Sequence, residues 1–386
     1  MSALHRFVAL YAFMYGAFGV SSPFMPAFFE GRGLAPQQLG VLFGAGTAIR
    51  LVSGPLGGRI ADLTQALRAV LVLCELLAAG VALSLLSASS FMPLLLINLL
   101  YAAVLAPTTS LADALALGAA QPRNGRPAFE YGWVRGTGSG AFVIGTLISG
   151  QVVGAWGLSS IVVLQAVLLV AAAGAASLVP TLERYEPAVA AEPAAPGGMV
   201  ALLRTPRFRR IMLLAALVLG SHAMHDTFAV IRWSAAGVTP PTASALWSES
   251  VAAEVVVFFL VGPRLLKRLG PAGVIALAAA AGVVRWVVMA SSTSVIALAL
   301  VQPLHGLTFA ALHLACMHLI ASIVPRPLAA TAQAMYALAA GTTTAVLTLA
   351  SGWLYGTFGA RAFLVMALLC AAAAPLTWGL RAGRSR

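Results

Sequence analysis

Ionisable side chains lie inside long apolar runs of this sequence, where charge is costly. They are Arg50, Glu75, Asp113, Arg135, His222, His225, Asp226, Glu249, Glu254, Arg285, His305 and His313. An arginine fork matches a carboxylate, and a carboxylate shielded from water can take up and release a proton. Residues of these types buried in apolar segments normally face a polar cavity or a partner. The set therefore predicts anion binding and proton transfer in a wet interior.

His222, His225 and Asp226 follow the spacing i, i+3 and i+4, which places them on one face of a helix. Such a face could suggest a metal site, but no cysteine or further clustered ligand lies nearby. We expect neither a metal nor a cofactor. We interpret the three residues as a polar patch lining a cavity, with helix contacts as the alternative.

Residues 129–140 read FEYGWVRGTGSG and place Arg135 before three alternating glycines. The glycines match a loose dinucleotide-binding fingerprint. That fingerprint needs a preceding strand and an acidic residue about 20 positions on, and no acid follows here. We interpret the stretch as a membrane helix that carries Arg135 inside and packs closely through its glycines.

The composition excludes a water-soluble domain. Of 386 residues, 60% are hydrophobic and 9% are charged, and the mean hydropathy is +0.94. The net charge of +12 is spread over short polar gaps, whereas a nucleic-acid site gathers its cations on one face. No Ser/His or paired-Asp arrangement stands out, so we expect no enzyme. The three cysteines lie in apolar runs and predict no disulfide framework.

Apolar runs of about 20 residues each predict an all-α membrane protein with twelve spanning helices. We place them at 7–29, 38–60, 68–88, 91–117, 133–155, 158–180, 210–235, 242–262, 272–291, 294–320, 331–356 and 361–380. The division is an N-terminal six-helix bundle (1–180), a Pro/Ala/Gly-rich linker (181–209) and a C-terminal six-helix bundle (210–386). The arginines and the single lysine, Lys267, gather at the N-terminus, in the even-numbered connections and in the tail. This bias predicts that both termini are cytoplasmic.

The two halves resemble each other at a shift of 204 residues, which lays Gly33-Leu34-Ala35-Pro36 on Gly237-Val238-Thr239-Pro240. Parallel six-helix repeats are a transporter design, with the binding site near the midplane between them. The residues from Gly58 to Asp62 add a G-x-x-x-D pattern at the end of the second span. This pattern resembles a signature of the major facilitator superfamily, in which it forms a cytoplasmic gate. The basic residue and glycine usual after the acid are Leu63 and Gln65 here.

Across nearly its full length the chain resembles the phenylpropionic acid permeases of that superfamily, relatives of the lactose permease group. The segments that carry the resemblance include SLADALA, FEYGWVRGTGSGAFVIGTLISG, SVAAEVVVFF, GVVRW and QPLHGLTFAALHLACMHLIA. The resemblance implies a substrate-binding role for Arg135 and coupling and binding roles for Arg285 and His305. At Thr308, where that group keeps a proton-carrying glutamate, this sequence departs. Proton carriage then falls to Glu254, Asp113 or His305.

We therefore predict a proton-coupled importer of a small aromatic carboxylate such as 3-phenylpropionate in the inner (plasma) membrane of a bacterium. Its partners are the substrate, the proton and the bilayer, without nucleic acid, and we expect a monomer. A sugar or nucleoside symporter and a drug or metabolite exporter are the alternatives. The residues expected to bind substrate are Arg135, Tyr131, His222, Asp226, Trp247 and His305. Those expected to couple protons are Glu254, Arg285, His305 and Asp113, with Gly58 and Asp62 at the gate. Glu75 has no assigned role.

Overall fold

The computed structural model describes residues 2–121, 129–180 and 198–381. Every regular element among these residues is a helix, so the predicted all-α class is confirmed. The chain divides into two compact units. The first contains residues 1–187 and 237–248, and the second contains residues 188–236 and 249–386.

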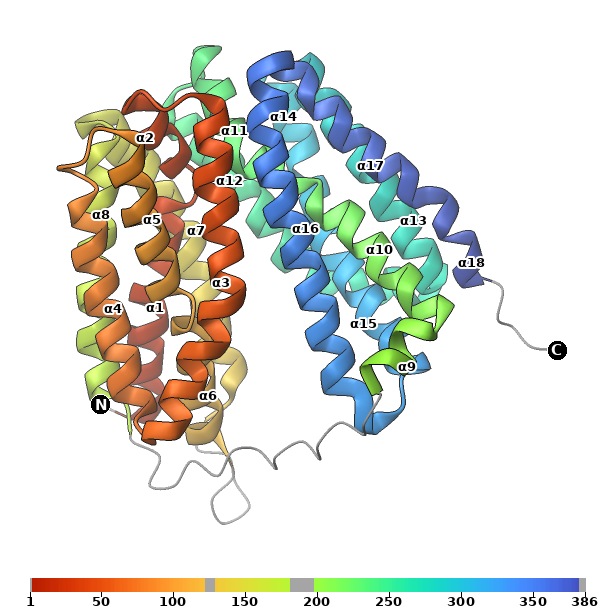
Figure 1. Ribbon diagram of the computed structural model, residues 1–386, viewed down its shortest axis with the longest axis horizontal. Coiled ribbons are helices and arrows are strands. Elements are labelled where there is room, and N and C mark those ends of the chain that lie inside the picture. Colours follow the sequence, from red (N-terminus) through yellow and green to blue (C-terminus); the bar gives the residue numbers. More distant parts are fainter. Residues whose placement is uncertain (1, 122–128, 181–197, 382–386) are drawn as a thin grey trace. The chain divides into compact units, whose positions relative to one another are not determined.

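The first unit holds eight helices and the start of a ninth (Figure 1). They are α1 (Ala3–Ser21), α2 (Met25–Gly31), α3 (Pro36–Thr64), α4 (Leu67–Ser84), α5 (Phe91–Leu105), α6 (Thr108–Ala120), α7 (Tyr131–Trp156), α8 (Ser159–Leu178) and the first part of α12 (Pro240–Val256). Helix α1 packs against α7 and α8, and α4 packs against α8. The backbones of α1 and α7 approach closely, because a Cβ on Gly145 would lie 2.5 Å from the carbonyl oxygen of Gly16.

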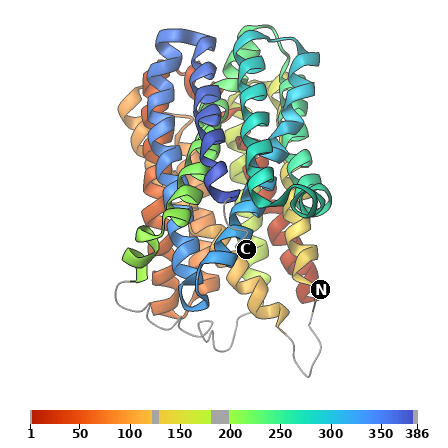
Figure 2. The ribbon, with the colours of Figure 1, turned by 90° about the vertical axis from the view of Figure 1, so that its right-hand side faces the viewer.

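The second unit holds the remainder of α12 and the elements after it, together with α9 to α11. These elements are α9 (Gly198–Arg204), α10 (Pro206–Gly220), α11 (His222–Ala235), α13 (Gly262–Ser291), α14 (Val295–Val301), α15 (Leu312–Ile323), α16 (Ala329–Phe358), α17 (Phe363–Leu376) and α18 (Trp378–Arg381). Helix α13 packs along α17 (Figure 2). Their contact is close, since a Cβ on Gly282 would lie 2.5 Å from Cys370 Sγ.

Ten helical stretches of the described residues are long and apolar enough to cross a membrane. Two of them are too long for one crossing, at 52 residues (Pro240–Ser291) and 55 residues (Arg326–Leu380). A straight helix of that length would extend about 80 Å, against about 30 Å of hydrocarbon. The backbone instead turns at Gly270 and Gly359, both at positive φ, a conformation that glycine adopts at low cost. Each long stretch therefore accounts for two predicted spans.

Several predicted spans are broken inside. The span at 7–29 is divided between α1 and α2, and the span at 91–117 is divided between α5 and α6 at Pro107. Proline lacks the N–H that continues a helix. The span at 210–235 is divided at Ser221, which places His222 at the start of α11.

The proposed linker at 181–209 lies partly outside the described residues. From Gly198 onward the chain is helical, and α10 begins at Pro206 rather than at residue 210.

The internal repeat has structural counterparts in the two halves. Gly33 and Gly237, which the repeat aligns, have φ values of 84° and 85°. Each glycine precedes a helix that begins at a proline three residues later, Pro36 or Pro240. The aligned positions thus make the same local turn.

Candidate functional site

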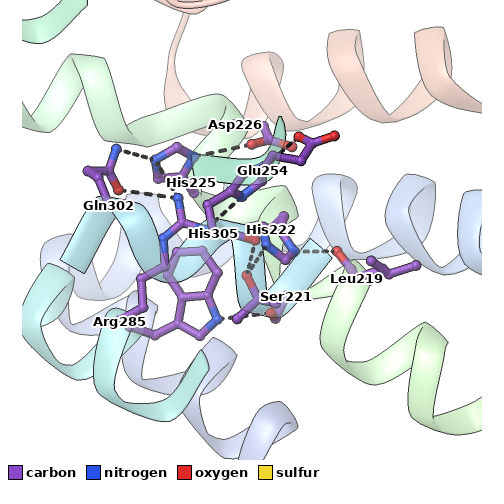
Figure 3. A network of polar contacts seen from close by, with 11 residues as sticks. Leu219, Ser221, His222, His225, Asp226, Glu254, Arg285, Gln302 and His305 are labelled. Carbon is purple, nitrogen blue, oxygen red and sulfur yellow. Dashed lines mark hydrogen bonds and ion pairs between the residues drawn. The ribbon is translucent and has the colours of Figure 1, made fainter. Parts of the chain in front are cut away.

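Polar side chains form one network inside the second unit, and Arg285 lies at its centre (Figure 3). The Arg285 side chain on α13 is 0% exposed. Its Nη1 lies 3.1 Å from His305 Nδ1, and its Nη2 lies 3.3 Å from His225 Nε2. Nη2 also donates to Gln302 Oε1 at 3.2 Å, and the guanidinium lies over the Trp286 ring at 4.6 Å.

A carboxylate lies on the far side of each histidine. His225 Nδ1 is 3.2 Å from Asp226 Oδ1, and His305 Nε2 is 3.4 Å from Glu254 Oε2. The Asp226 and Glu254 side chains are 56% and 28% exposed. The network therefore passes from partly exposed carboxylates, through histidines, to a buried arginine.

The donors fix the protonation of both rings. Arginine has only donors, so His305 Nδ1 accepts from Arg285 and its Nε2 carries the proton that is donated to Glu254. His225 Nε2 faces Arg285 and the amide nitrogen of Gln302, so its proton is on Nδ1 and is donated to Asp226. Both rings are neutral in this arrangement. Protonating either one would place a second cation against Arg285.

Close helix packing brings Glu254 and His305 together. Each lies just before a π-helical turn, Val257–Val261 after Glu254 and Leu307–Ala311 after His305. The two turns contact each other. A Cβ on Gly306 would lie 2.7 Å from the Ala253 carbonyl oxygen, so glycine is needed here for the two helices to approach. Single π turns frequently mark functional sites in helices.

His222, predicted to bind substrate, is held inside the second unit. It is 5% exposed, and its Nε2 lies 2.9 Å from Thr308 Oγ1 while Nδ1 lies 3.0 Å from the Leu219 carbonyl oxygen. Its ring packs edge-on against Trp286. Thr308, at the position where the resemblance implies a glutamate, thus acts as the partner of His222.

Arg135 in the first unit is exposed and rests on an aromatic face. Its guanidinium carbon lies 4.9 Å from the centre of the Tyr15 ring, and Tyr15 contacts the rings of Tyr11 and Phe18 on the same helix. Within the described ranges, no hydrogen bond or ion pair to Arg135 is found. The donor fork of Arg135 is available to an anion.

Asp113 is held by two tyrosines rather than by Arg135. Tyr131 Oη donates to Asp113 Oδ1 at 2.8 Å, and Tyr11 Oη makes a short hydrogen bond to the same oxygen. No ion pair joins Asp113 to Arg135 in the part of the chain that the structure describes. The tyrosines of α1 and α7 occupy the carboxylate instead.

The remaining predicted residues, Trp247, Gly58 and Asp62, belong to the first unit. Trp247 is buried on α12, in the segment that belongs to the first unit. Gly58 and Asp62 lie in the last turns of α3, and a Cβ on Gly58 would meet nothing within 4 Å. Among the described residues, no hydrogen bond to the Asp62 carboxylate is found. The gate thus stays a prediction.

The predicted close contact of the glycines after Arg135 is confirmed only for Gly138. A Cβ there would lie 2.9 Å from the Tyr15 ring, whereas Gly136 and Gly140 have nothing within 4 Å. Gly138 therefore sets the position of Tyr15, which supports Arg135.

Tyr11, Tyr15 and Gln302 were not predicted as site residues. Tyr11 and Tyr15 have the spacing i and i+4 in an apolar helix, and Gln302 precedes His305 by three residues. Polar residues at helical spacing from a charged one could have indicated them. Across the described segments, no three His, Cys, Asp or Glu residues are placed to hold a metal ion.

Comparison with known proteins gives consistent matches. The model of the MFS_1 like family matches residues 4–366. The chain is 31% identical over 372 residues, 94% of both chains, to the "Probable 3-phenylpropionic acid transporter" of Escherichia coli (strain K12). It is 23% identical to the "Uncharacterized transporter YwbF" of Bacillus subtilis (strain 168), over 79% of this chain and 74% of that protein.

Among solved structures, the nucleoside transporter NupG is similar with a TM-score of 0.84 at 15% identity, over 100% of both chains. A bacterial homologue of the lysosomal transporter Spinster is similar with a TM-score of 0.77 at 15% identity, over 97% of this chain and 95% of that one. At such identities the likeness concerns the fold.

Proposed function

We propose that this chain imports an aromatic carboxylate together with a proton. It belongs to the MFS_1 like family and is thus a multi-pass membrane transporter of a small molecule rather than an enzyme. The observation that carries this proposal is Arg135, an exposed guanidinium stacked on Tyr15. Such a site can bind a carboxylate through the arginine fork and a phenyl ring through neighbouring aromatic faces. A relative named as a probable 3-phenylpropionic acid transporter supports the same substrate class.

The Arg285 network supplies the proton site in this proposal. Both histidines accept a hydrogen bond from Arg285, so a proton is better added at a carboxylate than at a ring. Glu254 is the partly exposed carboxylate next to His305. Protonating Glu254 removes the charge that His305 Nε2–H faces and loosens the connection to Arg285. Deprotonation restores it.

Transport follows by alternating access, in which substrate and proton bind on one side of the membrane and leave on the other. We place both termini in the cytoplasm and the protein in the bacterial inner membrane. The distribution of lysine and arginine supports this orientation, and both sequence relatives are bacterial.

Arg135→Ala tests the substrate site. A hydrogen bond to a charged group contributes about 1.5–3 kcal/mol, so we expect the KM for 3-phenylpropionate to rise about 10- to 100-fold in proteoliposomes. Arg361→Ala, an exposed arginine on a connection, is the matched control and should leave KM unchanged.

An unchanged KM in Arg135→Ala would refute the assignment. Competition by neutral sugars or nucleosides, but not by aromatic acids, would assign the substrate to one of those classes instead.

A further inference from the structure

Glu75 on α4 is a buried carboxyl group that the transport mechanism does not use. Its side chain is 0% exposed, and neither of its oxygens has a hydrogen-bond partner. The carboxylates described above differ, because Asp113, Asp226 and Glu254 each face a tyrosine or a histidine. A charged carboxylate without a partner is very costly in a dry interior. Glu75 therefore requires a separate explanation.

The helices packed against α4 offer few charged groups. Helix α8 contributes the amide Gln165, and α5 contributes Tyr101. Helix α3 contributes Arg50, and α6 contributes Asp113, which accepts hydrogen bonds from Tyr11 and Tyr131. Both Arg50 and Glu75 lie within electrostatic range of Tyr101, and Cys74 within range of Glu75. Toward solvent, the other charges on α3 and α4 are Arg59, Asp62 and Arg68.

Polar groups on the helices packed against α4 lead toward an exposed cation. The Gln165 amide nitrogen makes a short hydrogen bond to Tyr101 Oη, and the other end of the amide, Oε1, is buried without a partner. Tyr101 is in turn within range of Arg50, whose residue is exposed. Helices α4, α5 and α8 thus carry a buried acid without a partner, a buried acceptor without a partner, and a tyrosine hydroxyl within electrostatic range of a cation.

We propose that Glu75 is an intramembrane proton-binding site of the first unit, protonated in this conformation, that releases its proton when Tyr101 and Arg50 reach it. A neutral carboxyl needs only one acceptor for its O–H, and Gln165 Oε1, on a helix packed against α4, is a buried acceptor without a partner. An ionised Glu75 needs a cation or water beside it. In this proposal the long side chain of Arg50 rearranges and supplies the cation. This site is distinct from the Arg285 network and adds a second titratable group to the proposed proton coupling.

Infrared difference spectroscopy of the purified, substrate-free protein tests the assignment without relying on transport. We expect a carbonyl band of a protonated carboxylic acid at neutral pH that disappears in Glu75→Gln. The band should persist in Glu249→Gln, a matched control in another apolar helix that changes a half-buried carboxylate. The same band in Glu75→Gln and the unchanged protein would overturn the proposal.

A second variant keeps the test decisive if Glu75→Gln does not fold. Glu75→Asp keeps a carboxyl group at this place but moves it back by one methylene, so the carbonyl band should persist at a shifted frequency. A band that neither shifts nor disappears in this variant would contradict the assignment.

A transport measurement separates a proton site from a packing role. This readout rests on the proposed function, whereas the infrared bands do not, so the two can fail independently. Substrate exchange by the unchanged protein should fall by half at the pH where half of the infrared band is lost, while Glu75→Gln should stay flat there. A parallel fall in both proteins would exclude Glu75 as the titrating group.

Discussion

Replacing Glu254 with glutamine should separate substrate movement from proton movement. The amide keeps the size of the side chain and resembles the protonated acid, but it cannot release a proton. His305 Nε2–H then faces a neutral group in every conformation. We expect Glu254→Gln to exchange substrate across the membrane at close to the normal rate while losing accumulation driven by a pH gradient.

The structure sets the size of the effect. The contact between His305 and Glu254 is long, at 3.4 Å, and Glu254 is partly exposed. We therefore take the low end of the range for a hydrogen bond to a charged group, about 1.5 kcal/mol. One pH unit supplies about 1.4 kcal/mol per proton, which corresponds to about tenfold accumulation. Charging Glu254 is thus comparable in free energy to the gradient it must couple to transport.

The assay uses proteoliposomes with an imposed gradient of about one pH unit. The unchanged protein should accumulate labelled 3-phenylpropionate about tenfold, and Glu254→Gln should only equilibrate it. Glu249→Gln changes another carboxylate of the same helix and should accumulate normally. Tenfold accumulation by Glu254→Gln would refute the assignment of the proton to Glu254.

Two further predictions concern the first unit. A cation–π contact contributes about 0.5–1 kcal/mol at exposed sites, so Tyr15→Leu should raise the KM for uptake about two- to fivefold. Tyr15→Phe keeps the ring and should leave KM unchanged. Equal KM values for the two variants would contradict the role of the ring. Gly145→Ala places a methyl group 2.5 Å from the Gly16 carbonyl oxygen and should destabilise the protein by about 1–3 kcal/mol, seen as a lower melting temperature in detergent. Gly140→Ala, with nothing within 4 Å, should not lower it, and equal melting temperatures would show that the α1–α7 contact yields.

The spanning helices could be predicted from sequence because their signal is the length of an apolar run. Breaks at Pro107 and Ser221 were not predicted. An apolar run does not show where its helix is interrupted, and in a membrane neighbouring groups can satisfy the backbone atoms that a break exposes. The break at Ser221 matters for the site, since it determines where His222 begins its helix.

The residue types of the site could be predicted, whereas several of their partners could not. Glu254, Arg285 and His305 were expected to take part in proton coupling, and the structure shows that His305 lies between the other two. Asp113 contacts Tyr11 and Tyr131, which its place in the sequence did not indicate. A buried charge signals that a partner exists, but the rotation of each helix selects which one. That rotation depends on packing over the whole unit.

For Glu75, burial could be predicted from the sequence, but its surroundings could not. Its position in an apolar run indicated a buried carboxyl group, but sequence gave no partner for it. Among the described residues, a buried acceptor without a partner on a helix packed against α4 belongs to Gln165, a neutral residue far along the chain. Such a neighbour has no signature in residue spacing.

The measurement that tests proton-coupled import most directly is the pH of a weakly buffered medium around proteoliposomes as substrate is added. We predict that 3-phenylpropionate makes the external medium more alkaline as protons enter with it, and that neutral sugars and nucleosides do not. Uptake of 3-phenylpropionate without any change in external pH would contradict the account, as would alkalinisation caused by a sugar or a nucleoside instead.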